Sequence, residues 1–401
     1  MRRTKSSLVV ALAAVLTLML ADMPSVFAAG SLIISEFRLR GPAGAQDEFI
    51  EIYNDSGVPH TVAAVSGTGY AIAASDGVTR CTIPNGTVIP ARGHFLCVGA
   101  TYSLVVTGNQ TFAVDIPDNA GIALFNNNTG GGSFSLANRF DAVGSTSEAN
   151  TLYKEGSGYP ALTPFDINYA FVRDECGKGG AVNLLGVCTI STPKDTDNNA
   201  ADFFFVDTNG TSAGAGQRLG APGVQNLLSP IQRDSGFSTL LLDATMASSA
   251  APNRVRDFTS DPPNNSTFGT LAIRRRFVNN TGAPVTLLRF RIIDLDTFPA
   301  ASGFADLRPR TTVGSVVVGG INDAVTCAAT GVPTTPPCTV TFFGGVLNSF
   351  PPQPNGGGFN STMDAPLGSP LAAGASIDLQ FLLGIQQTGS FRFYVNIEAV
   401  P

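Results

Sequence analysis

Short apolar segments separated by turn signals run along most of this chain. The clearest pair is Leu32–Leu39, LIISEFRL, and Asp47–Asn54, DEFIEIYN, which flank a short Gly-, Pro- and Ala-containing connection. Strand alternation would place Phe49, Glu51 and Tyr53 on one face of the second segment and its isoleucines on the other. The pattern predicts the opening strands of a β domain.

Dipeptides that favour turns occur between the apolar segments after Asn54. Asp76-Gly77 and Asn85-Gly86 are combinations that tolerate positive φ in tight hairpins. Further strand-like segments lie at Tyr70–Ala74, Thr79–Ile83, His94–Val98 and Gly121–Phe125. Strands at this spacing predict an all-β domain with an immunoglobulin-like sandwich fold over residues 29–226.

The second half of the chain also contains short apolar segments between turn residues, but its sequence does not repeat that of the first half. Residues 227–236 contain Ser229-Pro230 and few apolar residues, so we expect a linker there. Beyond it, apolar or alternating segments lie at Leu271–Asn279, Val285–Ile293, Val313–Val318, Thr339–Phe343, Ser376–Leu383 and Ser390–Ile397. We expect residues 237–401 to form a second β-sandwich.

The N-terminus has the features of a signal peptide. Three basic residues precede an apolar run over residues 8–20, and small residues stand at Val26 and Ala28. We expect cleavage after Ala28, hence a signal peptide over residues 1–28 and a secreted protein located outside the cell or at its surface. The apolar run is shorter than the roughly 20 residues of a membrane span, which disfavours a permanent anchor.

Composition agrees with a turn-rich β protein. Charged residues make up 13%, Gly (44) and Pro (26) are abundant, and Trp is absent. The net charge of −6 becomes −8 after loss of the signal peptide, which removes three basic groups and one acidic group. A mildly acidic chain has no general attraction for nucleic acid, so nucleic acid is an unlikely partner.

The six cysteines form three close pairs in the sequence: Cys81 with Cys97, Cys176 with Cys188, and Cys327 with Cys338. In an exported chain such pairs predict disulfides, although the sequence alone permits 15 connectivities. A zinc site is the alternative, but CxxC and Cys/His spacings are absent from the sequence.

Eight segments in order resemble the lamin-tail domain of secreted bacterial proteins. They are LIISEF (32–37), DEFIEIYN (47–54), VIPARGHFLCV (88–98), GIALF (121–125), DAVG (141–144), YAFVR (169–173), DTDNNAADF (195–203) and GAPGVQN (220–226). The resemblance covers about half the chain and implies an immunoglobulin-like fold. In exported proteins this domain often accompanies nucleases or phosphatases, which implies a targeting or binding role.

The chain departs from the lamin-tail pattern in two places. The tryptophan often found after the second strand is missing, with Tyr70 the nearest aromatic residue, and the insert between Cys176 and Cys188 lengthens a loop. In the second half, LRFRIIDLDTFP and LLGIQQTGSFRFYVNIEAV resemble a C-terminal module of exported bacterial proteins with unassigned role, which carries no activity.

Few residue patterns predict catalysis. The only histidines are His60 and His94, which we interpret as structural, and no serine lies in a GxSxG motif. Glu36, Glu48 and Glu51 lie on the first two predicted strands, but alternation places Glu48 and Glu51 on opposite faces. We therefore expect these carboxylates to serve the strand framework rather than acid/base catalysis.

One acidic segment offers candidate metal ligands. Asp195, Asp197 and Asn199 present oxygen atoms at alternating positions, as calcium loops do. The segment departs from the EF-hand pattern, because Ala200 and Val206 replace the required Gly and Glu. A structural turn is the preferred interpretation, and calcium binding stays open as the only cofactor prediction.

One basic cluster is also present, comprising Arg274, Arg275, Arg276, Arg289 and Arg291. If the two strands pair, Arg274, Arg276, Arg289 and Arg291 share a face and form a candidate site for an anionic polymer. The alternative is charge pairing with Asp294, Asp296 and Asp306, since unpaired like charges across strands repel.

Together these observations predict a secreted, non-catalytic binding or structural module that interacts with an extracellular protein or polysaccharide. An extracellular hydrolase of phosphoesterase or nuclease type with an unfamiliar site is the first alternative. Binding of an anionic polymer through the arginine cluster is the second.

Overall fold

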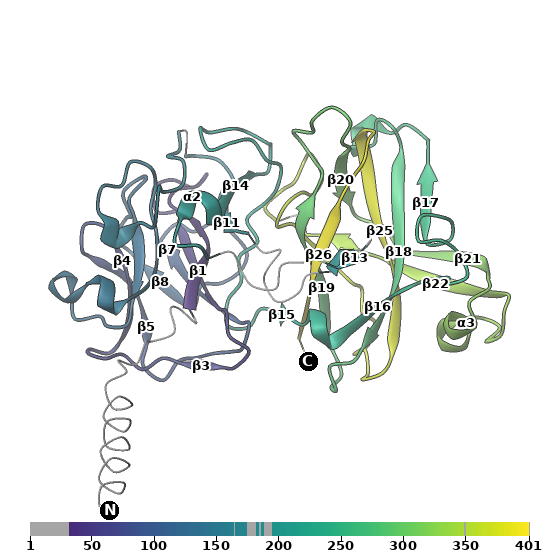
Figure 1. Ribbon diagram of the computed structural model, residues 1–401, viewed down its shortest axis with the longest axis horizontal. Coiled ribbons are helices and arrows are strands. Elements are labelled where there is room, and N and C mark those ends of the chain that lie inside the picture. The colour runs from purple at the N-terminus through teal and green to yellow at the C-terminus, as the bar shows by residue number, and fades with distance from the viewer. Residues whose placement is uncertain are drawn as a thin grey trace, which may run out of the picture.

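The computed structural model describes residues 32–163, 165–174, 182–183, 186–187, 195–348 and 350–400. The predicted signal peptide and the third cysteine pair, Cys176 and Cys188, lie outside the described residues. Figure 1 shows the described chain as two β-rich bodies side by side, with the earlier strands in one and the later strands in the other. The predicted all-β class is confirmed.

Strands of the N-terminal half form a sandwich. Its strands are β1 (Leu32–Arg38), β2 (Phe49–Asn54), β3 (His60–Thr61), β4 (Gly69–Ala74), β5 (Thr79–Pro84), β6 (Val88–Ile89), β7 (His94–Gly99), β8 (Gln110–Phe112), β9 (Ile122–Phe125), β10 (Arg139–Val143), β11 (Tyr169–Arg173) and β14 (Phe203–Asp207). One sheet has the order β14-β11-β1-β2-β7-β8 and the other β10-β9-β4-β5. Ile34, Ile52, Ile72, Leu124 and Phe171 are among the buried side chains of the core that these strands share.

The strands of the C-terminal half also form two sheets. They are β15 (Ile231–Gln232), β16 (Phe237–Leu241), β17 (Arg254–Asp257), β18 (Thr270–Asn279), β19 (Leu287–Leu295), β20 (Asp306–Arg310), β21 (Ser315–Ile321), β22 (Cys338–Gly344), β23 (Val346–Leu347), β24 (Thr362–Asp364), β25 (Ser376–Gln387) and β26 (Phe393–Val400). One sheet centres on β26-β19-β24-β23 and the other on β16-β18-β25-β22-β21. Phe277, Phe290 and Phe381 belong to their shared core.

Helical elements are short throughout the described residues. They are α2 (Asn199–Asp202), α3 (Ala324–Thr330), and the 3₁₀ turns η1 (Gly131–Ser133), η2 (Leu136–Asn138), η3 (Thr151–Tyr153), η4 (Asp234–Gly236) and η5 (Pro262–Asn264). Asp323 caps α3, since its side chain accepts a hydrogen bond from the Thr326 amide (2.8 Å). No helix in the described part of the chain is both long and apolar enough to cross a membrane.

The predicted linker is not an isolated connection. Within residues 227–236, β15 pairs with β26, so that Ile231 lies opposite Ala399. The short strands β12 (Val182–Asn183) and β13 (Gly186–Val187) also join this C-terminal sheet, because β12 pairs with β26. Backbone pairing therefore reaches from both the linker and the insert into the second half.

The outer face of the β1–β2 sheet is covered in part by the second half. Val172, Val206 and Val224 form an apolar cluster with Phe359 of the C-terminal half. Phe204 and Phe359 pack edge to face with ring centroids 5.5 Å apart. Such a contact positions the acidic side chains of β1 and β2 at the junction of the two halves.

Two of the three predicted disulfides lie within the described residues and are present. Cys81 of β5 and Cys97 of β7 join the two sheets of the N-terminal sandwich, and Cys327 of α3 joins Cys338 of β22. Disulfides persist in oxidising compartments, so both are compatible with an extracellular protein.

Candidate functional site

The acidic side chains of β1 and β2 are brought together by a β-bulge. The register pairs Ile34 with Ile52 and then Glu36 with Glu51, so one residue, Ser35, is extra on β1. The bulge turns Glu36 to the outer face, where it lies beside Glu51. Strand alternation alone does not reveal this pair, because it keeps Glu36 on the same face as Ile34.

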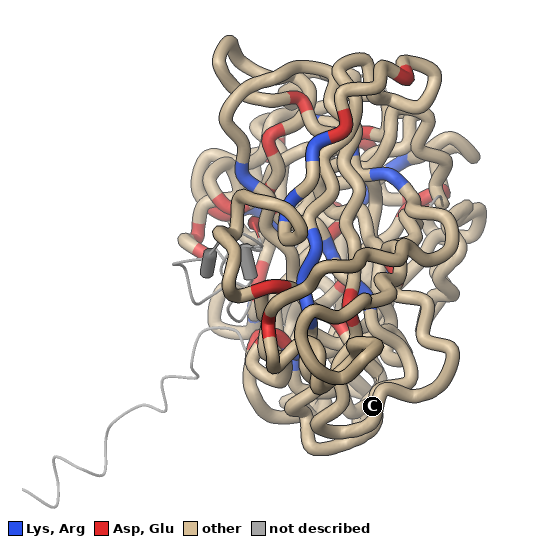
Figure 2. Tube along the Cα trace, turned by 90° about the vertical axis from the view of Figure 1, so that its right-hand side faces the viewer, with Lys and Arg blue, Asp and Glu red and all other residues tan. Residues whose placement is uncertain are grey.

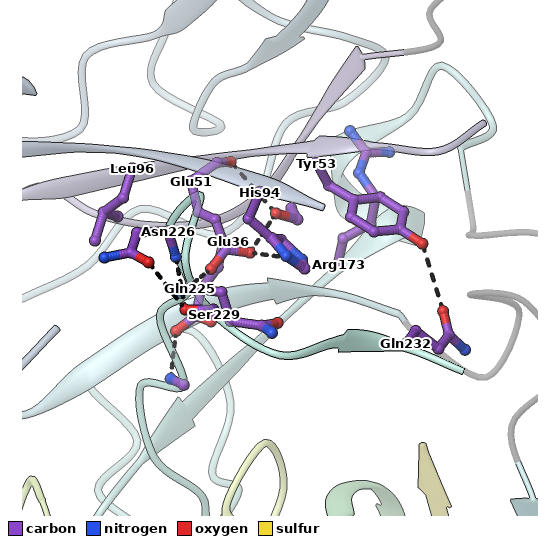
Figure 3. Close-up of polar contacts among 12 residues, drawn as sticks. Glu36, Glu51, Tyr53, His94, Leu96, Arg173, Gln225, Asn226, Ser229 and Gln232 are labelled. Carbon is purple, nitrogen blue, oxygen red and sulfur yellow. Dashed lines mark hydrogen bonds and ion pairs between the residues drawn. The ribbon is translucent and has the colours of Figure 1, made fainter. Parts of the chain in front are cut away.

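Both carboxylates bind the segment that leads out of the N-terminal half. The Gly223 amide donates to Glu36 Oε1 (2.9 Å) and the Gln225 amide donates to Glu51 Oε2 (2.5 Å). Figure 3 shows Glu36 and Glu51 directed from their strands toward this segment. The two glutamates therefore act as acceptors for otherwise unpaired backbone amides.

Glu36 also connects to the C-terminal half. Asn360 Nδ2 donates to Glu36 Oε2 (3.0 Å), and Arg291 Nη1 donates to Asn360 Oδ1 (2.5 Å). Arg291 and Arg289 in turn each lie 2.6 Å from a different oxygen of Glu398. We call Glu36, Glu51, Asn360, Arg291 and Glu398 the junction network.

Burial sets the ionisation of the junction network. Desolvation, with repulsion from Glu51, raises the pKa of Glu36 to about 8, although Arg291 opposes the change. Burial acts in the same direction on Glu398, but Arg289 and Arg291 outweigh it and hold the pKa of Glu398 below its ordinary value. The network thus has one carboxyl that is protonated near neutral pH and one carboxylate fixed by two cations.

Glu48 is separated from this network, as strand alternation predicts. Its Oε1 accepts a hydrogen bond from the Ile116 amide (2.9 Å), on the side of β2 that faces the sandwich core. Burial raises the pKa of Glu48 to about 9. Glu48 and Glu51 therefore do not form a catalytic pair.

The histidines occupy structural surroundings. His94 Nε2 lies 3.6 Å from Glu51 Oε1, and Ser35 Oγ donates to the same oxygen (2.5 Å). His94, Ser35 and Glu51 are each 2% exposed, so a substrate has no access to them in this conformation. His60 Nε2 lies 3.2 Å from the Tyr70 hydroxyl, and burial lowers the pKa of His60.

The two arginine strands do not pair, so the condition for a shared basic face is not met. β18, with Arg274 and Arg276, pairs with β16, β17 and β25, whereas β19, with Arg289 and Arg291, pairs with β24 and β26 in the other sheet. The four side chains therefore share no face, and Figure 2 shows basic and acidic positions interspersed along the trace of this half.

The same arginines are buried and partnered. Arg276 is 1% exposed and makes a bidentate pair with Asp378 (2.9 and 3.0 Å), while Arg274 Nε donates to Gln380 (2.9 Å). Arg275 is also buried, at 3% exposure. An anionic polymer has no exposed patch to contact here.

The alternative set of charge partners is also wrong. Asp294 and Asp296 lie 3.3 and 3.4 Å from Arg392, and Asp306 lies 2.6 Å from Arg308. The sequence analysis considered acidic residues that are close along the chain. The sheets instead place Asp378 of β25 opposite Arg276, and Glu398 of β26 opposite Arg289.

The three calcium candidates have different surroundings in the structure. Asn199 Oδ1 accepts hydrogen bonds from the Gly144 and Glu155 amides (2.9 and 3.0 Å), so this oxygen serves the backbone. Asp197 is exposed and adopts φ 54°. The predicted ligand set of Asp195, Asp197 and Asn199 therefore does not offer three free oxygen ligands.

Asp195 instead joins two acids from elsewhere in the chain. Carboxylate oxygens of Asp141, Glu155 and Asp195 lie within 4.8 Å of one another, and we call these three residues the acidic cluster. Arg173 contacts Asp141 (2.7 Å) and Asp195 (3.1 Å). Asp141 and Asp195 lie in conspicuous motifs, DAVG and DTDNN, whereas no sequence signal marks Glu155.

Mutual repulsion and burial favour proton uptake in the acidic cluster. Burial and the Asp141 charge raise the pKa of Glu155 to about 9 and that of Asp195 to about 6. Arg139 opposes this change at Glu155, and Arg173 opposes it at Asp195. The cluster therefore takes up protons more readily than isolated carboxyl groups do.

A polar groove of about 690 Å³ lies where the two halves meet. Residues lining this junction groove include Pro59 and Arg92 from the first half, and Arg233, Asp234 and Asn280 from the second. Arg92 donates to Asp55 (2.7 Å), whereas the buried Nε of Arg233 has no hydrogen-bond acceptor among the described residues. Arg233 is half-buried and lines the groove, so its guanidinium, but not the buried Nε, can donate to a ligand oxygen.

Comparison with known proteins gave no relatives: no protein-family model, no curated protein and no solved structure matches this chain.

Proposed function

We propose that this protein is a secreted, non-catalytic binding or structural module of the extracellular space. The observation that carries the proposal is the use of Glu36 and Glu51, the most conspicuous acidic pair, as buried supports between the two halves. Carboxylates that hold backbone amides and are shielded from solvent are not positioned to transfer protons to a substrate. Their arrangement favours a rigid two-part scaffold.

The lamin-tail resemblance remains part of this proposal. Its apolar segments supply strands β1, β2, β7, β9, β10, β11 and β14 of the N-terminal sandwich. The two packed and mostly antiparallel sheets support a sandwich architecture, which an immunoglobulin-like fold requires. A crystal structure of the mature protein, superposed on lamin-tail domains, tests this assignment.

We place the binding surface in the junction groove. Arg233 and Asn280 provide hydrogen-bond donors, and Pro59 and Pro90 provide apolar contacts. Hydroxyl-, carbonyl- or carboxylate-rich polymers present the acceptors that such a groove requires. An extracellular polysaccharide is therefore the ligand class that the groove favours, and an anionic polymer is the second candidate.

A binding assay with the mature protein tests the proposal. We expect immobilised protein to retain a cell-wall or matrix polysaccharide fraction, and Arg233→Ala to weaken this binding about tenfold or more, because it removes the guanidinium that lines the groove. Arg392→Ala is the matched control, since Arg392 is 59% exposed and lies outside the groove. Equal loss in both variants, or loss in neither, would place binding elsewhere.

Salt dependence separates the two ligand classes. Binding of an anionic polymer weakens steeply with salt, whereas binding of a neutral polysaccharide changes little. The hydrolase alternative is tested by esterase, phosphatase and nuclease assays on the same preparation. Turnover that disappears when a single acidic residue or serine is substituted would overturn the non-catalytic proposal.

A further inference from the structure

The acidic cluster of the N-terminal sandwich brings together oxygen ligands from three residues. Asp141 comes from β10, Glu155 follows η3, and Asp195 precedes α2, so three separate segments contribute. Their ligand oxygens lie within 4.8 Å of one another. This spacing suits a metal ion with ligand distances of about 2.3–2.6 Å.

One of these oxygens lacks a partner despite being buried. The Glu155 side chain is 5% exposed, and Arg139 contacts its Oε1 (2.9 Å). Its Oε2 has no hydrogen-bond donor among the described residues. A buried carboxylate oxygen without a donor is costly, and a bound cation would remove this cost.

The charges near the cluster do not balance. Asp202, 3.7 Å from Arg173, adds a fourth carboxylate to Asp141, Glu155 and Asp195, whereas Arg173 and Arg139 supply two cations. With all four carboxylates ionised, the negative groups exceed the positive groups by two charges, which protons or one divalent cation can neutralise. Asp202 itself is occupied, because it accepts hydrogen bonds from Thr196 and Asn198.

The cluster is also reachable from solvent. Asp141 is 1% exposed at its side chain, but Asp195 is 37% exposed and forms the outer edge. All three ligands are carboxylates, with neither His nor Cys in the group. Hard oxygen donors favour calcium over zinc or copper.

We propose that Asp141, Glu155 and Asp195 bind one calcium ion, with water completing its coordination. This site differs from a linear loop, because Asp197 and Asn199 take no part in it. Binding ties β10, the segment after η3 and the segment before α2 to one point, and it supplies the missing partner of Glu155. The inference is independent of the junction groove and of any polymer bound there.

Isothermal titration of chelator-treated mature protein with Ca²⁺ tests the site. We expect one ion per chain, with a Kd on the order of 10⁻⁴ M, as in extracellular calcium modules. Glu155→Gln and Asp195→Asn should each weaken binding at least tenfold. Because Glu155 is buried, Glu155→Gln could lose binding through misfolding. Asp195 is partly exposed, so Asp195→Asn tests the site without disturbing the packed interior.

Asp197→Asn is the matched control. It removes an acidic residue of the same segment that lies outside the cluster, so Ca²⁺ affinity should stay within about twofold of wild type. Loss of binding in Asp197→Asn but not in the cluster variants would overturn the proposal in favour of a loop site. Absence of Ca²⁺ binding, together with a higher Tm of Glu155→Gln, would show that protons neutralise the cluster instead.

Discussion

Individual charged side chains in this protein are largely used for internal contacts. Arg38, Arg173, Arg276 and Arg291 are among its largest fully buried side chains. Each has a carboxylate or amide oxygen within hydrogen-bond distance: the partners are Asp47, Asp141, Asp378 and Glu398, respectively. Breaking such a pair is costly because the remaining charge stays buried.

Glu36 predicts a measurable dependence of stability on pH. Its pKa is about 8 in the folded protein and 4.5 ordinarily, so the folded state keeps a proton that the unfolded state loses. The contribution of Glu36 to the free energy of unfolding therefore falls as the pH rises from about 4.5 to 8, by on the order of a few kcal/mol, and is constant at higher pH.

Glu36→Gln removes this titration. We expect the variant to gain stability relative to wild type between pH 5 and pH 8, as measured by urea denaturation at each pH. Thr61→Ala, an exposed substitution without a titrating group, should follow the wild-type curve. A constant difference between Glu36→Gln and wild type across this range would contradict a raised pKa.

The buried Arg276–Asp378 pair predicts a large loss of stability on truncation. Arg276→Ala leaves Asp378 buried without its bidentate partner, so we expect a loss of about 3–5 kcal/mol in urea denaturation. Arg392→Ala, at an exposed pair, should cost less than about 1 kcal/mol. The double variant Arg276→Met/Asp378→Leu should recover much of the loss; failure to do so would assign the cost to packing rather than charge.

At the scale of elements, the segment that follows β14 lies close to the C-terminal half. This close approach requires a glycine at position 223. A Cβ on Gly223 would lie 2.1 Å from Arg291 Nη1 and 2.7 Å from the Asn360 carbonyl oxygen. The Gly223 amide also donates to Glu36. Any larger residue there pushes the segment away from the junction network.

Gly223→Ala should therefore lower stability by about 1–3 kcal/mol through overpacking. Gly57→Ala is the control, because no atom lies within 4 Å of its added Cβ, and it should be neutral or slightly stabilising. Thermal unfolding of both variants checks this. Equal Tm values for the two would show that the junction adapts to the added methyl group.

At the scale of the whole molecule, the two halves share backbone pairing, an apolar contact and the junction network. β15 extends the C-terminal sheet, Phe359 covers the first sandwich, and Asn360 binds Glu36. Separating the halves would expose apolar residues on the outer face of the β1–β2 sheet and remove the hydrogen bond that Asn360 donates to Glu36. The interface is therefore part of the folded core.

We expect the mature protein to unfold in one cooperative transition. Calorimetry should give equal calorimetric and van't Hoff enthalpies, as two-state unfolding requires. Asn360→Ala, which removes the bond to Glu36, is the informative variant, since it should lower the temperature of the single transition or begin to split it. Two well-separated transitions in wild type would show that the halves are energetically independent.

The sequence by itself determined the all-β class, most strand positions and two disulfides that lie within the described residues. These features depend on local information: alternation of apolar residues, turn dipeptides such as Asp76-Gly77, and the spacing of Cys81 and Cys97 or Cys327 and Cys338. The opposite facing of Glu48 and Glu51 followed from the same two-residue period.

Only the tertiary structure decided which charged groups meet. The Ser35 bulge brought Glu36 beside Glu51, the sheet order separated Arg274 from Arg289, and folding brought Glu155 to Asp141 and Asp195. Long-range strand order and bulges depend on the packing of the whole chain, and a one-residue shift moves a side chain to the other face. The strands are therefore encoded locally, whereas the candidate sites arise from how the strands assemble.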